Sequence, residues 1–125
     1  MQTIVNPFIN KDLEMEITQK EENGILFFTI TGRLDADSSP EAEKVVHDAL
    51  EGQTTRVLFD LASLEYLSSA GLRVLLSTAK EMRRRDGKFV LCSLNEFVKE
   101  LFVVSGIQSL IPIADSVESG IEMLS

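Results

Sequence analysis

The chain is poor in the residues that build disulfides, metal centres and catalytic triads. Its 125 residues include one cysteine, Cys92, and one histidine, His47. A single cysteine excludes an intrachain disulfide, and its apolar neighbours predict a buried strand position rather than a reactive thiol. A single histidine leaves no second imidazole for a metal site, and its predicted place on a polar helix face does not suit a Ser-His-Asp triad. Neither glycine-rich phosphate-binding pattern occurs. The sequence therefore predicts no enzyme, no metal site and no cofactor.

Basic residues are also scarce. Twelve Lys and Arg stand against twenty Asp and Glu, which gives a formal net charge of −8. This balance disfavours direct binding to nucleic acid, and it disfavours docking on an anionic membrane surface. No apolar stretch approaches the ~20 residues of a membrane span, and the N-terminus lacks the pattern of a secretory signal. We therefore expect a cytoplasmic protein that does not enter the membrane.

Alternation and turn signals predict the strands. Residues 13–20 alternate between apolar and polar side chains, Asn23-Gly24 predicts a hairpin turn, and residues 25–31 follow as a second strand. Short apolar runs at 56–61 and 88–92 are typical of buried strands, and Pro112 favours an edge position for the strand at 110–113. Residues 1–12 are expected to be an N-terminal arm or an edge strand before a single domain at 13–125.

Apolar periodicity predicts four helices between these strands. The first begins with Ser38 and Glu41 at capping-box spacing, and the longest runs from Ser69 to about residue 85. Ser93 with Glu96 predicts the start of the third helix, whose inward side chains would be Phe97, Val98 and Leu101 and which Gly106 would end. Asp115 with Glu118 predicts the cap of the last helix.

The order of these elements predicts an α/β layered fold. We expect a mixed sheet of four to five strands, with about four helices mainly on one face. We also expect a monomer or a weak dimer. The expected core includes the apolar side chains of Leu58, Leu72, Leu75, Leu76, Val90 and Leu101.

One segment combines a strand, a loop and a helix start with paired serines. It reads Ser68-Ser69-Ala70-Gly71-Leu72 after the apolar strand at 56–61. A serine here can cap the helix, and the helix N-terminus favours an anion. Gly71 is costly inside a first turn, so it indicates a close approach either by the sheet below or by a partner above. From the residues alone, plain capping and packing are the favoured interpretation.

Several short motifs in this order resemble the STAS domain, which anti-sigma factor antagonists share with the cytoplasmic tails of sulfate transporters. The resemblance spans about residues 13–124. The motifs are Thr31-Gly32-Arg33-Leu34-Asp35, Leu58-Phe59-Asp60-Leu61, Ser68-Ser69-Ala70-Gly71-Leu72, and the stretch from Leu101-Phe102 to Gly106.

The resemblance implies a phosphorylation switch. Matching Gly71 and Leu72 to the family's Asp-Ser-x-Gly-Leu motif places the phosphorylated serine on Ser69, with Ser68 as the less favoured acceptor. Ser68 stands where the family usually has Asp. The implied partners are an anti-sigma factor with serine kinase activity and a serine phosphatase. The alternative is a STAS interaction or scaffold subunit without a switch, including a transporter-associated one.

Further residues are candidates for the partner surface. Asp35 matches the acidic residue of a family motif whose loop lies near the serine, and its alternative role is to start a turn. Arg73 and Ser77, with Lys80 and Arg84, form an outer stripe on the long helix. Such a stripe is either a partner face or only a solvated face, and the second is the commoner case. The predicted partner surface therefore comprises Asp35, Ser68, Ser69, Gly71, Arg73 and Ser77.

Overall fold

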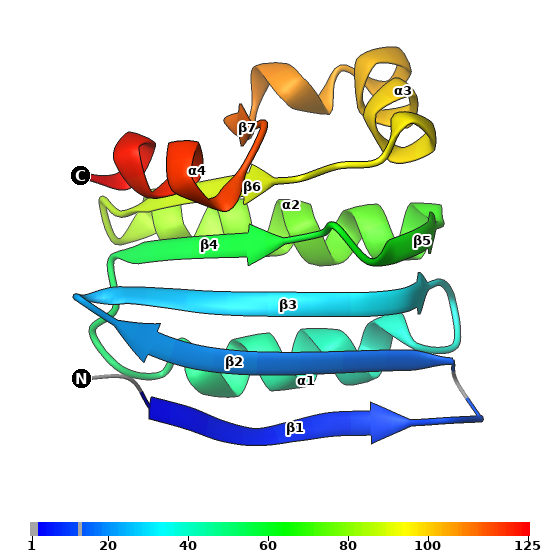
Figure 1. Cartoon of the computed structure of the whole chain (residues 1–125), viewed down its shortest axis with the longest axis horizontal. Coiled ribbons are helices and arrows are strands. Elements are labelled where there is room, and N and C mark those ends of the chain that lie inside the picture. The colour runs from blue at the N-terminus through cyan, green and yellow to red at the C-terminus, as the bar shows by residue number, and fades with distance from the viewer. Residues whose placement is uncertain (1–2, 13) are drawn as a thin grey trace.

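A mixed β-sheet organises the protein, as a computed structural model that describes residues 3–12 and 14–125 shows (Figure 1). Seven strands lie within the described residues. The strands are β1 (Thr3–Asn10), β2 (Met15–Glu22), β3 (Ile25–Leu34), β4 (Arg56–Asp60), β5 (Leu64–Leu67), β6 (Lys88–Cys92) and β7 (Ile113–Ala114). The helices are α1 (Ser39–Ala49), α2 (Ser69–Arg84), α3 (Glu96–Ser105) and α4 (Val117–Leu124), with a 3₁₀ turn, η1, at Ile107–Ser109.

The strands follow the order β1-β2-β3-β4-β6-β7, and β5 pairs with the end of β3. The first three strands are antiparallel, and the later pairs are parallel. Asn23 and Gly24 both have positive φ, 53° and 80°, so the predicted hairpin turn is confirmed. The predicted α/β class with a mixed sheet is also confirmed. The sheet has more strands than the four to five expected. β5 was not predicted, and β1 takes the edge-strand alternative that was expected for residues 1–12.

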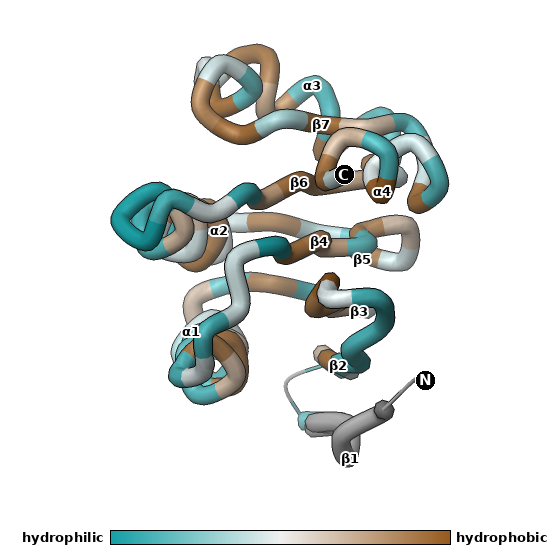
Figure 2. Tube along the Cα trace, turned by 90° about the vertical axis from the view of Figure 1, so that its left-hand side faces the viewer, coloured by the Kyte–Doolittle hydropathy of each residue, from teal (hydrophilic) through white to brown (hydrophobic). Residues whose placement is uncertain are grey.

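The helices divide between the two faces of the sheet (Figure 2). α1, α2 and α3 pack on one face over a large cluster that includes Phe28, Phe59 and Leu75. α4 covers part of the other face, where Leu124 packs near Leu58. Most helices therefore share one face, as predicted. Cys92 is buried on the α4 side of the sheet, also as predicted.

The expected core is confirmed for Leu58, Leu75 and Val90, which are 0–2% exposed. Leu72, Leu76 and Leu101 are only partly buried against the core. On α2, Val74 and Thr78 face inward in place of Leu72 and Leu76. On α3, Phe102 is buried in place of Leu101. The predicted inward face of α2 was therefore displaced around the helix axis, although Leu75 was assigned correctly.

Three predicted helix caps were wrong. Ser38 makes no side-chain cap, because its hydroxyl donates to the carbonyl of Arg33 at 2.7 Å. α3 is capped by Asn95, whose side chain accepts from Val98 N–H at 2.8 Å, and not by Ser93. α4 begins with a capping box between Ser116 and Ser119, not with Asp115 and Glu118. For α3 and α4 a neighbouring polar residue makes the cap instead, whereas α1 has no side-chain cap.

Gly71 explains how closely α2 approaches the sheet. A Cβ atom at this position would lie 2.5 Å from the carbonyl oxygen of Leu34 and 2.6 Å from a methyl group of Leu67. A backbone carbonyl cannot move aside as a flexible side chain can. The close approach that the sequence indicated is therefore an approach by the sheet below.

The burial of Leu75 gives a first prediction. Leu75→Ala should lower the free energy of unfolding by ~2–5 kcal/mol, because a fully buried leucine leaves a cavity. Urea unfolding followed by circular dichroism measures this change. Leu110→Ala is the matched control, since Leu110 is 50% exposed and should lose less than about 1 kcal/mol. Equal losses in the two variants would contradict the assigned orientation of α2.

The contact beneath Gly71 gives a second prediction. Gly71→Ala should lower the free energy of unfolding by ~1–3 kcal/mol, because the added methyl group overpacks the contact with Leu34. Gly52→Ala is the control, because nothing lies within 4 Å of a Cβ there. If thermal unfolding shows the two variants to be equally stable, the close approach of α2 to β3 is wrong.

Candidate functional site

The ends of β3 and β5 meet the start of α2 at one end of the sheet (Figure 1). Leu34 of β3 pairs with Leu67 of β5, and the N–H of Ser68 donates to the Leu34 carbonyl at 3.0 Å. α2 begins at the next residue, Ser69. Two paired strands thus fix the first turn of α2 beside the loop that follows β3.

The structure separates the roles of the two serines. The hydroxyl oxygen of Ser68 accepts from the N–H of Gly71 at 3.3 Å, so Ser68 is the helix cap. Ser69 is the first helical residue and is exposed, and its hydroxyl makes no hydrogen bond with any residue in 3–12 or 14–125. The first turn of α2 carries no acidic side chain. Ser69 therefore presents a free hydroxyl at the positive end of a helix.

Asp35 organises the loop between β3 and α1. One carboxylate oxygen accepts from the N–H groups of Asp37 and Ser38, each at 3.0 Å, and the other lies 3.5 Å from Nε of Arg33. Burial alone would raise the pKa of Asp35, but the hydrogen bonds to its carboxylate outweigh that effect. The pKa of Asp35 therefore lies below its usual value. Asp35 thus starts a turn, and its side chain remains 23% exposed.

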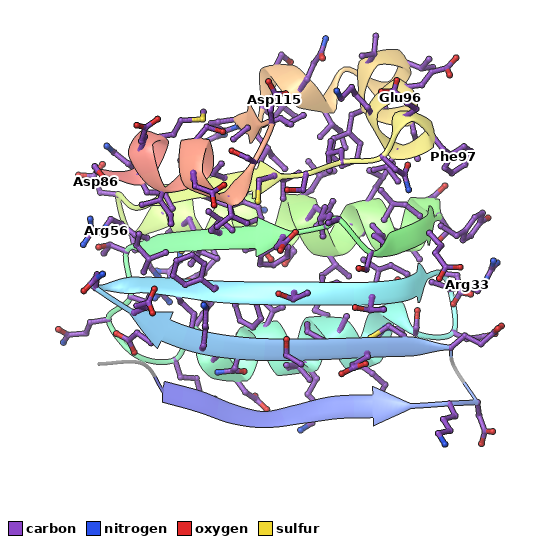
Figure 3. The ribbon with its side chains drawn as sticks, in the orientation of Figure 1. Arg33, Arg56, Asp86, Glu96, Phe97 and Asp115 are labelled. Carbon is purple, nitrogen blue, oxygen red and sulfur yellow. The ribbon has the colours of Figure 1, made fainter. Side chains whose placement is uncertain are left out.

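Three further side chains, those of Arg33, Tyr66 and Phe97, are stacked on one another near this loop. Figure 3 shows Arg33 and Phe97 at the same end of the molecule. The guanidinium carbon of Arg33 lies 4.2 Å from the ring centroid of Tyr66. The Tyr66 and Phe97 rings are stacked, with centroids 6.4 Å apart and planes inclined by 18°. Phe97 is 55% exposed. We call Arg33, Tyr66 and Phe97 the aromatic ladder. Exposed aromatic and arginine side chains of this kind are typical of protein–protein contacts.

Sequence reasoning missed the aromatic ladder. Phe97 was expected to point inward, but α3 is capped at Asn95, and Val98 and Phe102 are the buried residues. The prediction for Phe97 was therefore wrong, whereas that for Val98 is confirmed. No local pattern could have found the ladder, because its members come from β3, β5 and α3. The exposed side chains of Val103 and Val104 extend the apolar surface of α3.

The remaining predicted site residues lie on α2. Gly71 is buried, so it supports the site from beneath and is not available to a partner. Arg73 and Ser77 are exposed, as are Lys80 and Arg84. Hydrogen bonds from Arg84 and Arg85 lower the pKa of Glu81 to about 2. The end of the basic stripe is thus partly neutralised, and Arg73 and Ser77 are its members nearest to Ser69.

Neither a metal centre nor a reactive thiol stands out in the described part of the chain. Burial, together with the negative charges of Asp60 and Glu118, raises the pKa of the Cys92 thiol to about 11. His47 is exposed, as predicted. Residues 3–12 and 14–125 contain no group of three or more His, Cys, Asp or Glu arranged to hold a metal ion. Across the same residues, no helix is long and apolar enough to cross a membrane.

Comparisons with known proteins agree with this geometry. The sequence model of the STAS domain matches residues 16–120. BtrV of Bordetella bronchiseptica, whose name assigns it provisionally to the anti-sigma factor antagonists, is 36% identical over 105 residues, covering 84% of this chain and 90% of BtrV.

Solved structures show the same fold. An anti-sigma factor antagonist from Mycobacterium paratuberculosis has a TM-score of 0.82 at 16% identity, covering 88% of this chain and 93% of that one. The Bacillus cell fate determinant SpoIIAA in its phosphorylated form has a TM-score of 0.69 at 16% identity, covering 87% of this chain and 99% of that one.

Proposed function

Since the chain belongs to the STAS domain family, we propose that it acts as an anti-sigma factor antagonist. In this role it binds an anti-sigma factor in the cytoplasm and thereby releases a sigma factor. The names of its relatives support the class of partner. The observation that carries the proposal is the exposed, unbonded hydroxyl of Ser69 on the same end of the sheet as the aromatic ladder.

The proposed switch is phosphorylation of Ser69. The partner, acting as a serine kinase, transfers the γ-phosphoryl group of ATP to the Ser69 hydroxyl oxygen, and ADP and a proton leave. A separate phosphatase hydrolyses the phosphoserine and resets the switch. The structural relative SpoIIAA, which is known in a phosphorylated form, supports a switch of this kind.

Phosphorylation would act on the interface rather than on the fold. It adds about −1.5 to −2 charges at pH 7. Among the described residues the Ser69 hydroxyl makes no hydrogen bond that the phosphate would break, and the helix N-terminus tolerates an anion. Burying that charge against a partner without matched cations is costly. The phosphorylated protein should therefore keep its structure and lose its partner.

Ser68 is the less suitable acceptor. Its hydroxyl oxygen accepts from Gly71 N–H and is only partly exposed, whereas Ser69 is exposed. Serine caps a helix about as well as the Asp that the family usually has here. The substitution thus retains the cap and removes one negative charge beside the acceptor.

Phosphate mapping tests this proposal. With the cognate anti-sigma kinase and ATP, mass spectrometry should find phosphate on Ser69, and Ser69→Ala should abolish incorporation. Ser69→Ala should still bind the anti-sigma factor, because the Ser69 hydroxyl that it removes makes no hydrogen bond within the described residues. Ser69→Asp should weaken binding, though less than phosphate does, since it carries less charge.

Ser68→Ala is the matched control, and it should still accept phosphate. Phosphate on Ser68 alone would contradict the assignment of the acceptor. A partner that binds wild type, Ser69→Ala and Ser69→Asp equally, with no phosphate on either serine, would favour a scaffold subunit without a switch.

The aromatic ladder gives a separate prediction. Phe97→Ala should weaken binding of the anti-sigma factor at least about tenfold, because exposed aromatic side chains commonly dominate interface energies. Phe97→Tyr keeps the ring stacked on Tyr66 and should bind within about threefold of wild type. Isothermal titration calorimetry measures both. Equal affinities for Phe97→Ala and wild type would remove the ladder from the partner surface.

A further inference from the structure

A hollow of about 400 Å³ lies at the far end of α2 from Ser69. The end of α2, the start of β6, residues 110–112 and the end of α4 surround it. Figure 3 shows Asp86, one of its rim residues, at the opposite end of the molecule from Arg33 and Phe97. We call it the Phe89 hollow. Its apolar lining comes mainly from Ala79, Met82, Phe89, Ile111 and Met123.

Among the described residues, the backbone hydrogen bonds between β6 and the β7 side of the sheet are missing at Phe89. Beyond it, the N–H groups of Leu91 and Ser93 donate to Pro112 and Ala114 on the β7 side, at 3.0 and 3.2 Å. Backbone groups alternate along a strand, so the N–H and C=O of Phe89 face the same side. Pro112 has no N–H to donate to the Phe89 carbonyl. No backbone group in residues 3–12 or 14–125, and no side chain of residues 11, 12 or 14–125, accepts from the Phe89 N–H.

This open position is unusual for a buried residue. Phe89 is 6% exposed, and more than 90% of buried backbone donors in proteins have a partner. The donor and acceptor of Phe89 stand side by side on a strand edge, which is the arrangement that an extended peptide residue complements. Within β6 (Lys88–Cys92), Phe89 is the one residue open on the β7 side, since Lys88 donates to Thr55 on the β4 side and Leu91 donates to Pro112.

Two cations stand at the rim of the hollow. Arg83 and Lys88 are exposed and line it, and neither forms an ion pair within the described part of the chain. Asp86 is the one carboxylate in the lining, and it opposes them together with the C-terminal end of α2. The rim nevertheless carries two positive charges against one negative, in a protein whose net charge is −8.

We propose that the Phe89 hollow binds the carboxy-terminal residue of a partner polypeptide that ends in an apolar side chain. The amide N–H of that residue donates to the Phe89 carbonyl, and a carboxylate oxygen accepts from the Phe89 N–H. Arg83 and Lys88 attract the carboxylate, and the apolar side chain packs against Met82 and Met123. One open backbone position admits one residue, and the volume lies in the range of pockets for small ligands.

The probe that tests this proposal is N-acetyl-leucine, which carries the amide N–H, the apolar side chain and the free carboxylate. It is titrated into the ¹⁵N-labelled full chain, and ¹H–¹⁵N NMR spectra are recorded. The amide of Phe89 should shift and saturate, together with amides of its neighbours around the hollow, while the amide of Ser69 stays in place. N-acetyl-leucinamide lacks the charge and should bind at least about tenfold more weakly.

Variants of the full chain sharpen the test. Lys88→Gln should weaken binding of N-acetyl-leucine several-fold, whereas Lys99→Gln, an exposed lysine on α3, should not change it. Ala79→Leu should fill part of the hollow and abolish saturable shifts, with its unfolding midpoint confirming that it is folded. The proposal is overturned if the Phe89 amide does not shift, if the amide-capped probe binds as tightly, or if Ala79→Leu binds like wild type.

Discussion

The carbonyl group of Leu34 is the point on which the candidate site depends. Its oxygen accepts a hydrogen bond from the N–H of Ser68, the residue that caps α2. The same oxygen lies directly beneath Gly71. One backbone group at the end of β3 thereby fixes both the distance of α2 from the sheet and the residue at which α2 begins. The next residue, Asp35, closes the loop into α1 through hydrogen bonds to Asp37 and Ser38. Ser69 is therefore exposed at the fixed start of a helix, so a phosphate placed there would change the surface that a partner meets without changing the fold.

The charges around this frame suit a local switch. Arg33 is shared between the Asp35 carboxylate and the Tyr66 ring, so it already has partners before any phosphate is present. A phosphate on Ser69 would lie at a helix N-terminus, which offsets part of its charge without drawing Arg33 away from the ladder. The surface next to it is aromatic and apolar, with Phe97 at its outer end. A partner that covers the ladder closely would have to desolvate the phosphate, and this cost falls on the complex alone.

Local sequence patterns predicted most strands and helices. The features that they missed depend on contacts between residues far apart in the sequence. The alternation that places Met15 and Ile17 inward and the Asn23-Gly24 turn depend on neighbouring residues, so they could be read directly. The cap of α3 could not be predicted in this way, because Asn95 and Ser93 are both suitable cap residues. Asn95 also donates to the Leu64 carbonyl, 31 residues away in sequence, and this contact is non-local. That choice of cap turns Phe97 outward. β5 has only four residues and pairs with β3 alone, so it carries too short a pattern to predict. Ser69 was accessible to sequence reasoning because its motif is contiguous, whereas the aromatic ladder was not.

The two outer edges of the sheet differ in the length of their edge strands. On one side β1 adds eight antiparallel residues to β2. On the other, β7 contributes only two residues, and Pro112 removes the donor that would continue the pairing toward Phe89. An open strand edge invites pairing with other chains, and natural proteins limit that risk with short strands and prolines. Here residues 110–112 and the two helices enclose the gap, so a full strand cannot add to β6. What remains is a single donor and a single acceptor at Phe89. An edge that could otherwise pair with any strand is thereby restricted to one residue, as the proposed binding of a carboxy-terminal residue requires.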